Sequence, residues 1–368
     1  MPSGLSSLGD IKGKRVLVRA PFNVPMDGEI IRDTVRIDDC VSTIDFLINA
    51  GARIILVSHH SDGADTSLKP VADYLSKHLP VVFVEDIFSY TGNDKVVLAE
   101  NLRRYPGEEK NDPAFAAQLA ELADIYVNDD FTAAHREHAS VVSVPKLMPS
   151  VMGLSFQREY EGLSKFASPT SPSLAIIGGA KPETKLPLIA KMADRFDTVY
   201  AGGVSANVLL EDKGEEIGTS VSASKEIQNL DAITADARIK LPIDARIIGR
   251  DGVMRAGPIV GVKKDESIVD AGTESLAELS ALIAQAQTII WNGPLGDYER
   301  GYGESTHLLA HMLMDCEAQV VIGGGDTLAS IKDIDTTGAF AFVSEAGGAM
   351  LHLFAYGSLP AVEALESH

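Results

Sequence analysis

Three segments in the second half of the chain place glycines directly after apolar runs that are typical of buried strands. They are residues 178–181 (GGAK), 202–203 (GG) and 323–327 (GGGDT). Glycine lets a ligand approach the backbone closely, and open parallel sheets bind ligands at the carboxyl ends of their strands. The helices that follow such clusters offer free N–H groups to phosphate. Three clusters in one region therefore predict a nucleotide-binding site.

Asp326 lies among the glycines of the third cluster. A carboxylate there suits Mg²⁺, which keeps several waters and takes its other ligands from substrate phosphates. The alternative is that Asp326 caps the following helix. The chain contains neither G-x-G-x-x-G nor G-x-x-x-x-G-K-[ST], which argues against a dinucleotide-dependent dehydrogenase and against a P-loop enzyme.

Basic and polar residues follow the strands expected in the first half of the chain. They are Arg19, Asn23, His59, Arg103, His135 and Arg136, together with Arg36 at the start of the first helix. One such arginine alone would be interpreted as a surface charge. Because parallel strands bring their carboxyl ends to one edge of the sheet, these residues are expected to gather there. Arginine binds phosphate and carboxylate in bidentate fashion, so the cluster predicts a site for a small polyanion.

Other kinds of chemistry have little support in the sequence. His135 and His138 lie three residues apart without a third ligand at suitable spacing, so a zinc site is not expected. There is no G-x-S-x-G motif and no Cys/His pair for covalent catalysis. Cys40 and Cys316 lie in apolar helical patterns and are expected to be two buried thiols, with no disulfide.

Short β-rich runs alternate with amphipathic helical segments along the chain, which predicts an α/β fold. Between the first two strands Ile37, Val41, Ile44 and Ile48 repeat at helical spacing, and Gly51 follows as a C-terminal cap. The expected strands are residues 15–18, 54–57, 81–84, 96–99 and 125–127, then 174–177, a strand at 199, 288–291, 320–322 and 340–343. The pattern predicts two doubly wound parallel-sheet (Rossmann-like) domains.

A Pro/Ser stretch at residues 167–173 (ASPTSPS) marks the boundary between the two domains. The segment 156–166 before it has a helical pattern and is expected to be a rigid connector. We therefore predict an N-terminal domain at 1–155, completed by the C-terminal tail 355–368, a connecting helix and linker at 156–172, and a C-terminal domain at 173–354.

The composition is that of a well-packed protein large enough for two domains: 368 residues, with 45% hydrophobic and 23% charged residues. The N-terminus has no signal-peptide core, and no stretch approaches the roughly 20 apolar residues that span a bilayer, so a cytoplasmic location without a membrane partner is expected. The net charge of −20 repels polyanions and argues against nucleic-acid binding. The acidity is compatible with a salty cytoplasm or simply with solubility.

Six ordered segments resemble the signature segments of the phosphoglycerate kinase family, and together they span nearly the whole chain. They are residues 18–25 (VRAPFNVP), 100–103 (ENLR), 126–136 (YVNDDFTAAHR), 178–181 (GGAK), 291–296 (WNGPLG) and 323–327 (GGGDT). Residues 203–208 (GVSANV) and 346–349 (AGGA) are more similar to the archaeal branch of that family than to the bacterial one.

The resemblance implies an N-terminal domain that holds 3-phosphoglycerate, a C-terminal domain that holds ATP or ADP, and a hinge helix that lets them close. The implied reaction is reversible phosphoryl transfer between 1,3-bisphosphoglycerate and MgADP, giving 3-phosphoglycerate and MgATP in glycolysis or gluconeogenesis. Mg²⁺ would accompany the nucleotide. The partners would be these small molecules, and the protein is expected to be a monomer.

Position by position, the resemblance also implies site residues. The acid-substrate set is Arg19, Asn23, Arg36, His59, Arg103 and Arg136. The nucleotide set is Gly178, Lys181, Lys185, Gly202, Asn292, Pro294, Glu299, Gly324, Gly325, Asp326 and Thr327, with Glu299 on the ribose and Asp326 on the metal. The catalytic set is Arg36 and Lys185, which approach from opposite domains, with the N–H groups of Gly347 and Gly348.

Three positions depart from the family pattern. Pro21 replaces the Asp of V-D-F-N-V-P, Asp62 replaces the arginine of S-H-L-G-R-P, and Glu345 replaces a threonine before glycines. These changes leave open the alternative that the chain is a diverged member of the family, which binds nucleotide or a phosphorylated ligand with little or no turnover. A two-domain solute-binding protein is a further alternative, but it requires export, and no signal peptide is visible.

Overall fold

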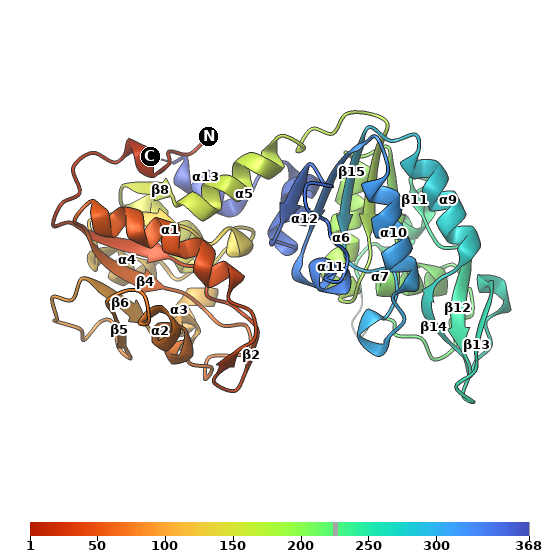
Figure 1. Ribbon diagram of the computed structural model, residues 1–368, viewed down its shortest axis with the longest axis horizontal. Coiled ribbons are helices and arrows are strands. Elements are labelled where there is room, and N and C mark those ends of the chain that lie inside the picture. The colour runs from red at the N-terminus through yellow and green to blue at the C-terminus, as the bar shows by residue number, and fades with distance from the viewer. Residues whose placement is uncertain (224–226, 368) are drawn as a thin grey trace. The chain divides into compact units, whose positions relative to one another are not determined.

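The computed structural model describes residues 1–223 and 227–367, and the chain divides into two compact units (Figure 1). Unit 1 consists of Met1–Glu161 together with Ser358–His368, and unit 2 consists of Gly162–Gly357. The last residue of the predicted tail 355–368, His368, lies outside the described residues. Each unit is an α/β domain around a parallel sheet, so the predicted fold class is confirmed.

Unit 1 contains a six-stranded sheet in the order β5-β6-β4-β1-β7-β8, in which all neighbouring strands are parallel. Its strands are β1 (Arg15–Arg19), β4 (Arg53–Val57), β5 (Val81–Val84), β6 (Val96–Ala99), β7 (Ile125–Asn128) and β8 (Ser150–Met152). Five were predicted from their apolar runs, whereas β8 was not. In register, Arg19 lies opposite Val57 and Asn128, so the last residues of three strands meet at one edge.

Helices cover both faces of this sheet. α1 (Val35–Asn49) and α2 (Lys69–Leu75) pack on one face through buried residues that include Ile37, Ile44 and Leu75. α4 (Pro113–Glu121) and α13 (Pro360–Leu365) belong to the other layer. The helix predicted between the first two strands is α1. It ends just before Gly51, whose φ of 78° only glycine adopts readily. Both chain termini lie in this unit, where the Met1 amine pairs with Glu366 (Figure 1).

Unit 2 contains a second six-stranded parallel sheet, in the order β11-β10-β9-β15-β16-β17. Its strands are β9 (Ser173–Ile177), β10 (Thr198–Ala201), β11 (Ile239–Lys240), β15 (Thr288–Asn292), β16 (Gln319–Gly323) and β17 (Phe342–Ser344). Residues 340 and 341 were predicted to be part of the last strand but precede it. α9 (Thr273–Ile283) and α10 (Glu304–Met314) bury Leu279 and Leu309 against one face. α6 (Pro182–Ala193) packs with α12 (Gly348–Tyr356).

A three-stranded antiparallel sheet at one end of unit 2 was not predicted (Figure 1). It consists of β13 (Met254–Pro258), β12 (Asp244–Ile248) and β14 (Ser267–Ala271), in that order. Its core is small, and β13 has no fully buried residue. The apolar signal in the sequence is therefore weak, which explains why the segment was missed.

The predicted connector, 156–166, corresponds to α5 (Leu154–Ser164), and the boundary between the units falls inside it. Both cysteines are free. Cys40 is buried in α1, as predicted, but Cys316 is only half-buried and follows the end of α10, so its predicted place inside a helix and its predicted full burial are wrong. No helix among the residues described here has the length and apolar character that crossing a membrane requires.

Candidate active site

Basic residues from separate segments of unit 1 gather near the carboxyl ends of β4 and β6. His59 follows β4, Arg103 lies in the short helix Leu102–Arg104 after β6, and Arg136 and His138 follow β7 and the turn Phe131–Ala133. Each of the last three lies close enough to His59 to influence its charge. The structure thus brings together residues up to 79 positions apart in the chain.

Burial sets the charge state of the two histidines in this basic cluster. It lowers the pKa of His59 well below its ordinary value, and the neighbouring Arg19 and Arg103 lower it further. Burial together with Arg136 lowers the pKa of His138 to about 4. Both imidazoles are therefore neutral at pH 7, and the positive charge of the cluster comes from its arginines.

Several nitrogens in this cluster have no hydrogen-bond partner among the described residues. They are Nε2 of His59, Nε of Arg136 and Nδ1 of His138, and all three are buried. Native interiors rarely leave such groups unpaired, so they indicate a place for a ligand or ordered water. A phosphate or a carboxylate can accept hydrogen bonds from several donors at once.

The other predicted acid-substrate residues occupy different positions. Arg36 is half-buried and donates from Nη1 to the Asn23 carbonyl at 2.9 Å. The Asn23 side-chain oxygen accepts from the Ser61 amide at 2.9 Å. Arg19 is 0% exposed, so it lies beneath the cluster and not on its surface. No exposed part of Arg19 remains that could contact a substrate.

Asp62, which replaces an arginine of the family pattern, is 65% exposed. Its Oδ2 atom lies 3.8 Å from Nδ1 of His60, whose Nε2 donates to the Val24 carbonyl at 2.9 Å. No ion pair between Asp62 and an arginine is found in the described part of the chain, so nothing indicates that Asp62 positions an arginine of the cluster.

We expect Asp62→Arg to tighten binding of the predicted acid substrate by about fivefold at low salt, and Asp62→Asn to give a smaller gain. An exposed carboxylate with water between it and the anion repels the anion by about 0.5 kcal/mol. Asn removes this repulsion, whereas Arg removes it and adds an attraction of similar size, which together correspond to about fivefold. Calorimetric titrations at two salt concentrations would measure both gains, which should shrink at the higher salt. An affinity order of wild type above Asn above Arg would contradict direct repulsion.

In unit 2 the glycine clusters bring backbone segments into close contact. The Gly178 amide donates to the Asn292 carbonyl at 2.9 Å, and the Gly179 amide donates to the Pro294 carbonyl at 2.6 Å. The loop after β9 therefore lies directly against the loop after β15. A Cβ atom on Gly178 would overlap the Pro294 carbonyl, so only glycine fits there.

Lys185 extends from α6 into this contact. Its Nζ atom donates to the Gly178 carbonyl and lies near Gly293. Burial lowers the pKa of Lys185 to about 8, Asp326 partly offsets this, and Lys181 adds to the lowering. Lys185 is a half-buried cation that faces the carboxylate of Asp326 among glycines. Such an arrangement fits a group that carries concentrated negative charge, such as a phosphate.

Two predicted nucleotide residues use their side chains inside the protein. Nδ2 of Asn292 donates to the Gly323 carbonyl at 2.7 Å. The Thr327 hydroxyl accepts from the Gly293 amide at 2.7 Å and donates to Gly323 at 2.8 Å. These bonds fix the glycine loop after β16 against the loop after β15. Gly347, which precedes α12, lies against Gly324 on the other side of that loop.

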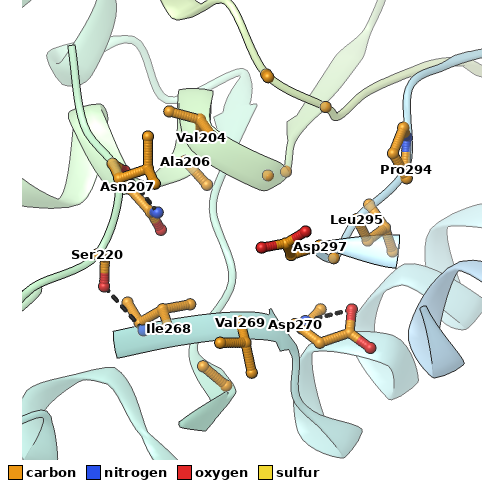
Figure 2. A pocket seen from close by; sticks show the side chains of 18 of the residues that line it. Val204, Ala206, Asn207, Ser220, Ile268, Val269, Asp270, Pro294, Leu295 and Asp297 are labelled. Atoms are coloured by element: carbon orange, nitrogen blue, oxygen red, sulfur yellow. Dashed lines mark hydrogen bonds between the residues drawn. The ribbon is translucent and has the colours of Figure 1, made fainter. Parts of the chain in front are cut away.

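A cavity of about 270 Å³ opens beside these loops. Figure 2 shows Val204 and Ala206 of α7 (Gly203–Asp212) facing Ile268 and Val269 of β14, with Leu295 nearby. This apolar slot suits a flat, poorly charged ring such as a nucleobase. Of the predicted nucleotide residues, the cavity is lined by Gly202, Pro294, Glu299 and Asp326.

The sequence analysis missed the apolar wall of this cavity. The wall includes Val204, Ala206, Leu210, Pro242, Ala245, Ile259, Ile268, Val269 and Leu295. Most of these residues are of the same types as ordinary core residues, so the sequence could not show that they line a cavity. The resemblance of residues 203–208 to a family segment was the only hint at this region.

Four carboxylates line the cavity, but they have different surroundings. Asp270 accepts from Ser305 of α10, and Asp297, which lines the cavity, accepts from the backbone and the side chain of Arg300 (Figure 2). Glu299 and Asp326 are exposed. No cluster of three or more metal-ligating side chains is found within residues 1–223 and 227–367. Asp326, at the start of α11 (Gly325–Ser330), fits a metal only if phosphates and water supply the remaining ligands.

The remaining predicted residues lie at the ends of helices. Lys181 is exposed and precedes α6 with a φ of 68°. Gly348 begins α12, and the half-buried Glu345 lies three residues before it. Gly325 begins α11, so three helices start around these loops and direct their free N–H groups toward them.

Comparison with known proteins agrees with this geometry. Residues 5–356 match the family described as phosphoglycerate kinase. A phosphoglycerate kinase from Zymomonas mobilis is 36% identical over 392 residues, which cover 99% of each chain. The structure of phosphoglycerate kinase from Coxiella burnetii superposes with a TM-score of 0.80 at 33% identity, covering 100% of this chain and 98% of that one.

A second solved structure, phosphoglycerate kinase from Pyrococcus horikoshii, has a TM-score of 0.83 at 27% identity. It covers 99% of this chain and 98% of its own. The similarity to both structures therefore extends over both units, including the antiparallel sheet that the sequence did not reveal.

Proposed function

The chain belongs to the phosphoglycerate kinase family, and we infer that it catalyses reversible phosphoryl transfer between 1,3-bisphosphoglycerate and MgADP. The products are 3-phosphoglycerate and MgATP, in glycolysis or gluconeogenesis. The observation that carries this inference is that one chain contains both a buried arginine and histidine cluster and a glycine-lined cavity with an apolar slot. A diverged protein that only binds nucleotide has no specific observation in its favour.

We propose that unit 1 binds 3-phosphoglycerate. This unit corresponds closely to the predicted N-terminal domain, 1–155 with the tail 355–368. Arg103 and Arg136 would hold its charged groups, and the unpaired Nε2 of His59 would donate to it. Arg36 lies at the start of α1 and is proposed to meet the transferred phosphoryl group. The two neutral histidines avoid adding charge, which limits the repulsion among the arginines when the site is empty.

We propose that unit 2, as the predicted domain 173–354, binds the nucleotide, with residues 156–172 as the connector. The base would occupy the slot between α7 and β14, and Glu299 would contact the ribose. Lys185 and the helix starts at Gly325 and Gly348 would face the phosphates. Phosphoryl transfer needs positioned positive charge and little covalent help, and these groups would supply that charge on the nucleotide side.

Asp326 is the proposed Mg²⁺ ligand, because its carboxylate is exposed, lines the cavity and faces Lys185. When bound, the metal neutralises charge on the β- and γ-phosphates. The protein contributes one carboxylate that orients the metal–nucleotide complex, and Lys185 contributes a cation on the other side.

Asp326→Asn is expected to weaken MgADP binding by about tenfold or more, a loss of about 1.4 kcal/mol. Binding of metal-free ADP should change little, because the carboxylate acts on the metal and not on the base. Calorimetry with and without Mg²⁺ separates the two roles. Equal weakening of both would make Asp326 only a helix cap, as the sequence also allowed.

The assignment of one substrate to each unit can be tested with two variants. Arg136→Gln should weaken binding of 3-phosphoglycerate and leave MgADP binding unchanged. Asp326→Asn should weaken MgADP binding and leave 3-phosphoglycerate binding unchanged. Titration of each ligand into each variant gives four affinities. If either variant weakened both ligands equally, the separate assignment would be wrong.

Four finer predictions concern the branch of the family, the location, the oligomeric state and the partners. The comparisons do not support the archaeal-like branch, because the Zymomonas relative is 36% identical and the Coxiella structure 33% identical, whereas the Pyrococcus structure is 27% identical. We propose a cytoplasmic location and a monomeric state, as the sequence and its family resemblance predicted. The partners are expected to be the small-molecule substrates alone, without nucleic acid or membrane.

A further inference from the structure

Arg19 is the most deeply buried arginine of unit 1, and it has a set of partners that the reaction does not explain. Its Nη1 atom pairs with Asp130 at 2.9 Å, and both side chains are 0% exposed. Its Nε donates to the Ser140 hydroxyl at 3.0 Å. Asp130, which follows β7, is therefore the carboxylate paired with Arg19. This pair fixes the guanidinium in one orientation.

The remaining arm of the guanidinium reaches His59. Nη2 of Arg19 lies 2.6 Å from Nδ1 of His59. Because arginine has no acceptor, Nδ1 must accept this hydrogen bond and cannot carry a proton. The proton of a neutral imidazole is then on Nε2, which is buried and has no partner in the described structure.

The charged groups that act on the His59 ring are mainly cations. The charged and titratable groups that act on His59 are Arg19 from β1, Arg103 from the short helix after β6, and Arg136 and His138 after β7. Arginines cannot accept a hydrogen bond, so the Nε2 proton is suited to an incoming anion. Because the atom is covered, the groups that cover it must shift when the anion binds.

We propose that Arg19, held by Asp130, is a positioning residue that fixes His59 as a neutral Nε2–H donor for the acid substrate. Arg19 itself does not touch the substrate. This inference rests on the proposed binding of 3-phosphoglycerate in unit 1. It differs from the role that the resemblance implied for Arg19, which was direct contact.

The tautomer can be measured without any variant. In protein labelled with ¹⁵N-histidine, the nitrogen chemical shifts report which ring nitrogen carries the proton, and comparison with His59→Gln identifies the signal. We expect His59 to be the neutral Nε2–H form throughout pH 5.5–8, a range chosen to span the ordinary pKa of about 6.5. A proton on Nδ1, or a cationic ring at pH 6, would overturn the proposal.

Substrate binding supplies the second readout. The amide nitrogen of glutamine lies near the place of Nε2, whereas that of asparagine lies near the place of Nδ1. We expect His59→Gln to bind 3-phosphoglycerate within about threefold of the wild type, and His59→Asn to bind about tenfold or more weakly. The ratio of wild-type to Gln affinity should not change with pH. A ratio that rises steeply below pH 6.5 would mean that His59 binds as a cation.

The role of the pair is tested by Arg19→Met/Asp130→Asn, which removes both charges together and keeps the side-chain oxygen that caps Ala133. With no donor at Nδ1, His59 should show a mixture of tautomers and the affinity should fall about tenfold. Arg15→Gln, at the exposed start of β1, is the matched control. It should change neither the His59 tautomer nor the affinity for 3-phosphoglycerate. An unchanged His59 spectrum in the double variant would overturn the role of Arg19.

If the wild type did not bind 3-phosphoglycerate at all, the proposed function would fail, and the spectrum would still decide the tautomer.

Discussion

Replacement of Lys185 by alanine is expected to lower kcat by about a hundredfold or more, with a modest loss of nucleotide affinity. Lys185 is the cation that α6 places against the glycine loops, facing Asp326. Removing one preorganised charge contact to a transition state typically costs about 3 kcal/mol. Steady-state rates with saturating ATP and 3-phosphoglycerate would measure the loss. Lys191→Ala, at the exposed end of the same helix, should leave kcat unchanged.

The lowered pKa of Lys185 adds a pH signature to this prediction. Because burial brings the pKa to about 8, the free enzyme loses this cation as the pH rises through that value. We therefore expect kcat/KM for ATP to fall above pH 8. Lys185→Arg keeps its charge at every accessible pH, so it should remove that decline even if its rate is lower. An unchanged kcat in Lys185→Ala would exclude Lys185 from the catalytic set.

Gly293→Ala is expected to destabilise unit 2 by about 2 to 5 kcal/mol. The residue has a φ of 97°, which disfavours any side chain by about 1–2 kcal/mol. A Cβ atom would also overlap the Gly178 carbonyl and lie 2.8 Å from Nζ of Lys185. Overpacking of this kind adds about 1–3 kcal/mol. The same displacement should weaken nucleotide binding, because Lys185 loses its position.

The single tryptophan makes this measurement specific to unit 2. Trp291 is buried in β15 and its Nε1 donates to the Gly293 carbonyl at 2.9 Å, so its fluorescence reports unfolding of this sheet. Gly301→Ala is the matched control: its φ is 88°, but a Cβ atom there meets nothing within 4 Å. We expect the control to lose only the backbone contribution. Equal destabilisation of both variants would mean that the close contact with Gly178 contributes nothing.

The parallel sheets could be predicted from sequence because their strands are continuous apolar runs, as in β6 and β15, where every residue is buried. Strands of this kind are buried on both faces and stand out between turn residues. β13 has alternating exposed and half-buried residues, and its sheet rests on a small core, so no comparable signal exists. Local pattern therefore predicted most strands of the two main sheets, but it missed their short strands β8 and β11 and the whole antiparallel sheet.

The positions of several polar residues at strand ends could be predicted, but the directions of their side chains could not. Arg19 was correctly placed at a strand end, yet its direction depends on Ser140, 121 positions away. A tertiary hydrogen bond of that separation leaves no local trace in the sequence. The apolar slot could not be predicted for a related reason. Residues such as Ile268 and Leu295 are of types that occur both in cavity walls and in cores.

The central claim is that this chain turns over both substrates, and a coupled assay of the purified protein tests it directly. The assay follows ADP formation from ATP and Mg²⁺ with and without 3-phosphoglycerate. We predict that ATP consumption requires 3-phosphoglycerate, saturates with it and is largely lost in Lys185→Ala. Tight nucleotide binding without any ATP consumption that depends on 3-phosphoglycerate would contradict the claim and would identify the chain as a family member that binds without catalysing transfer.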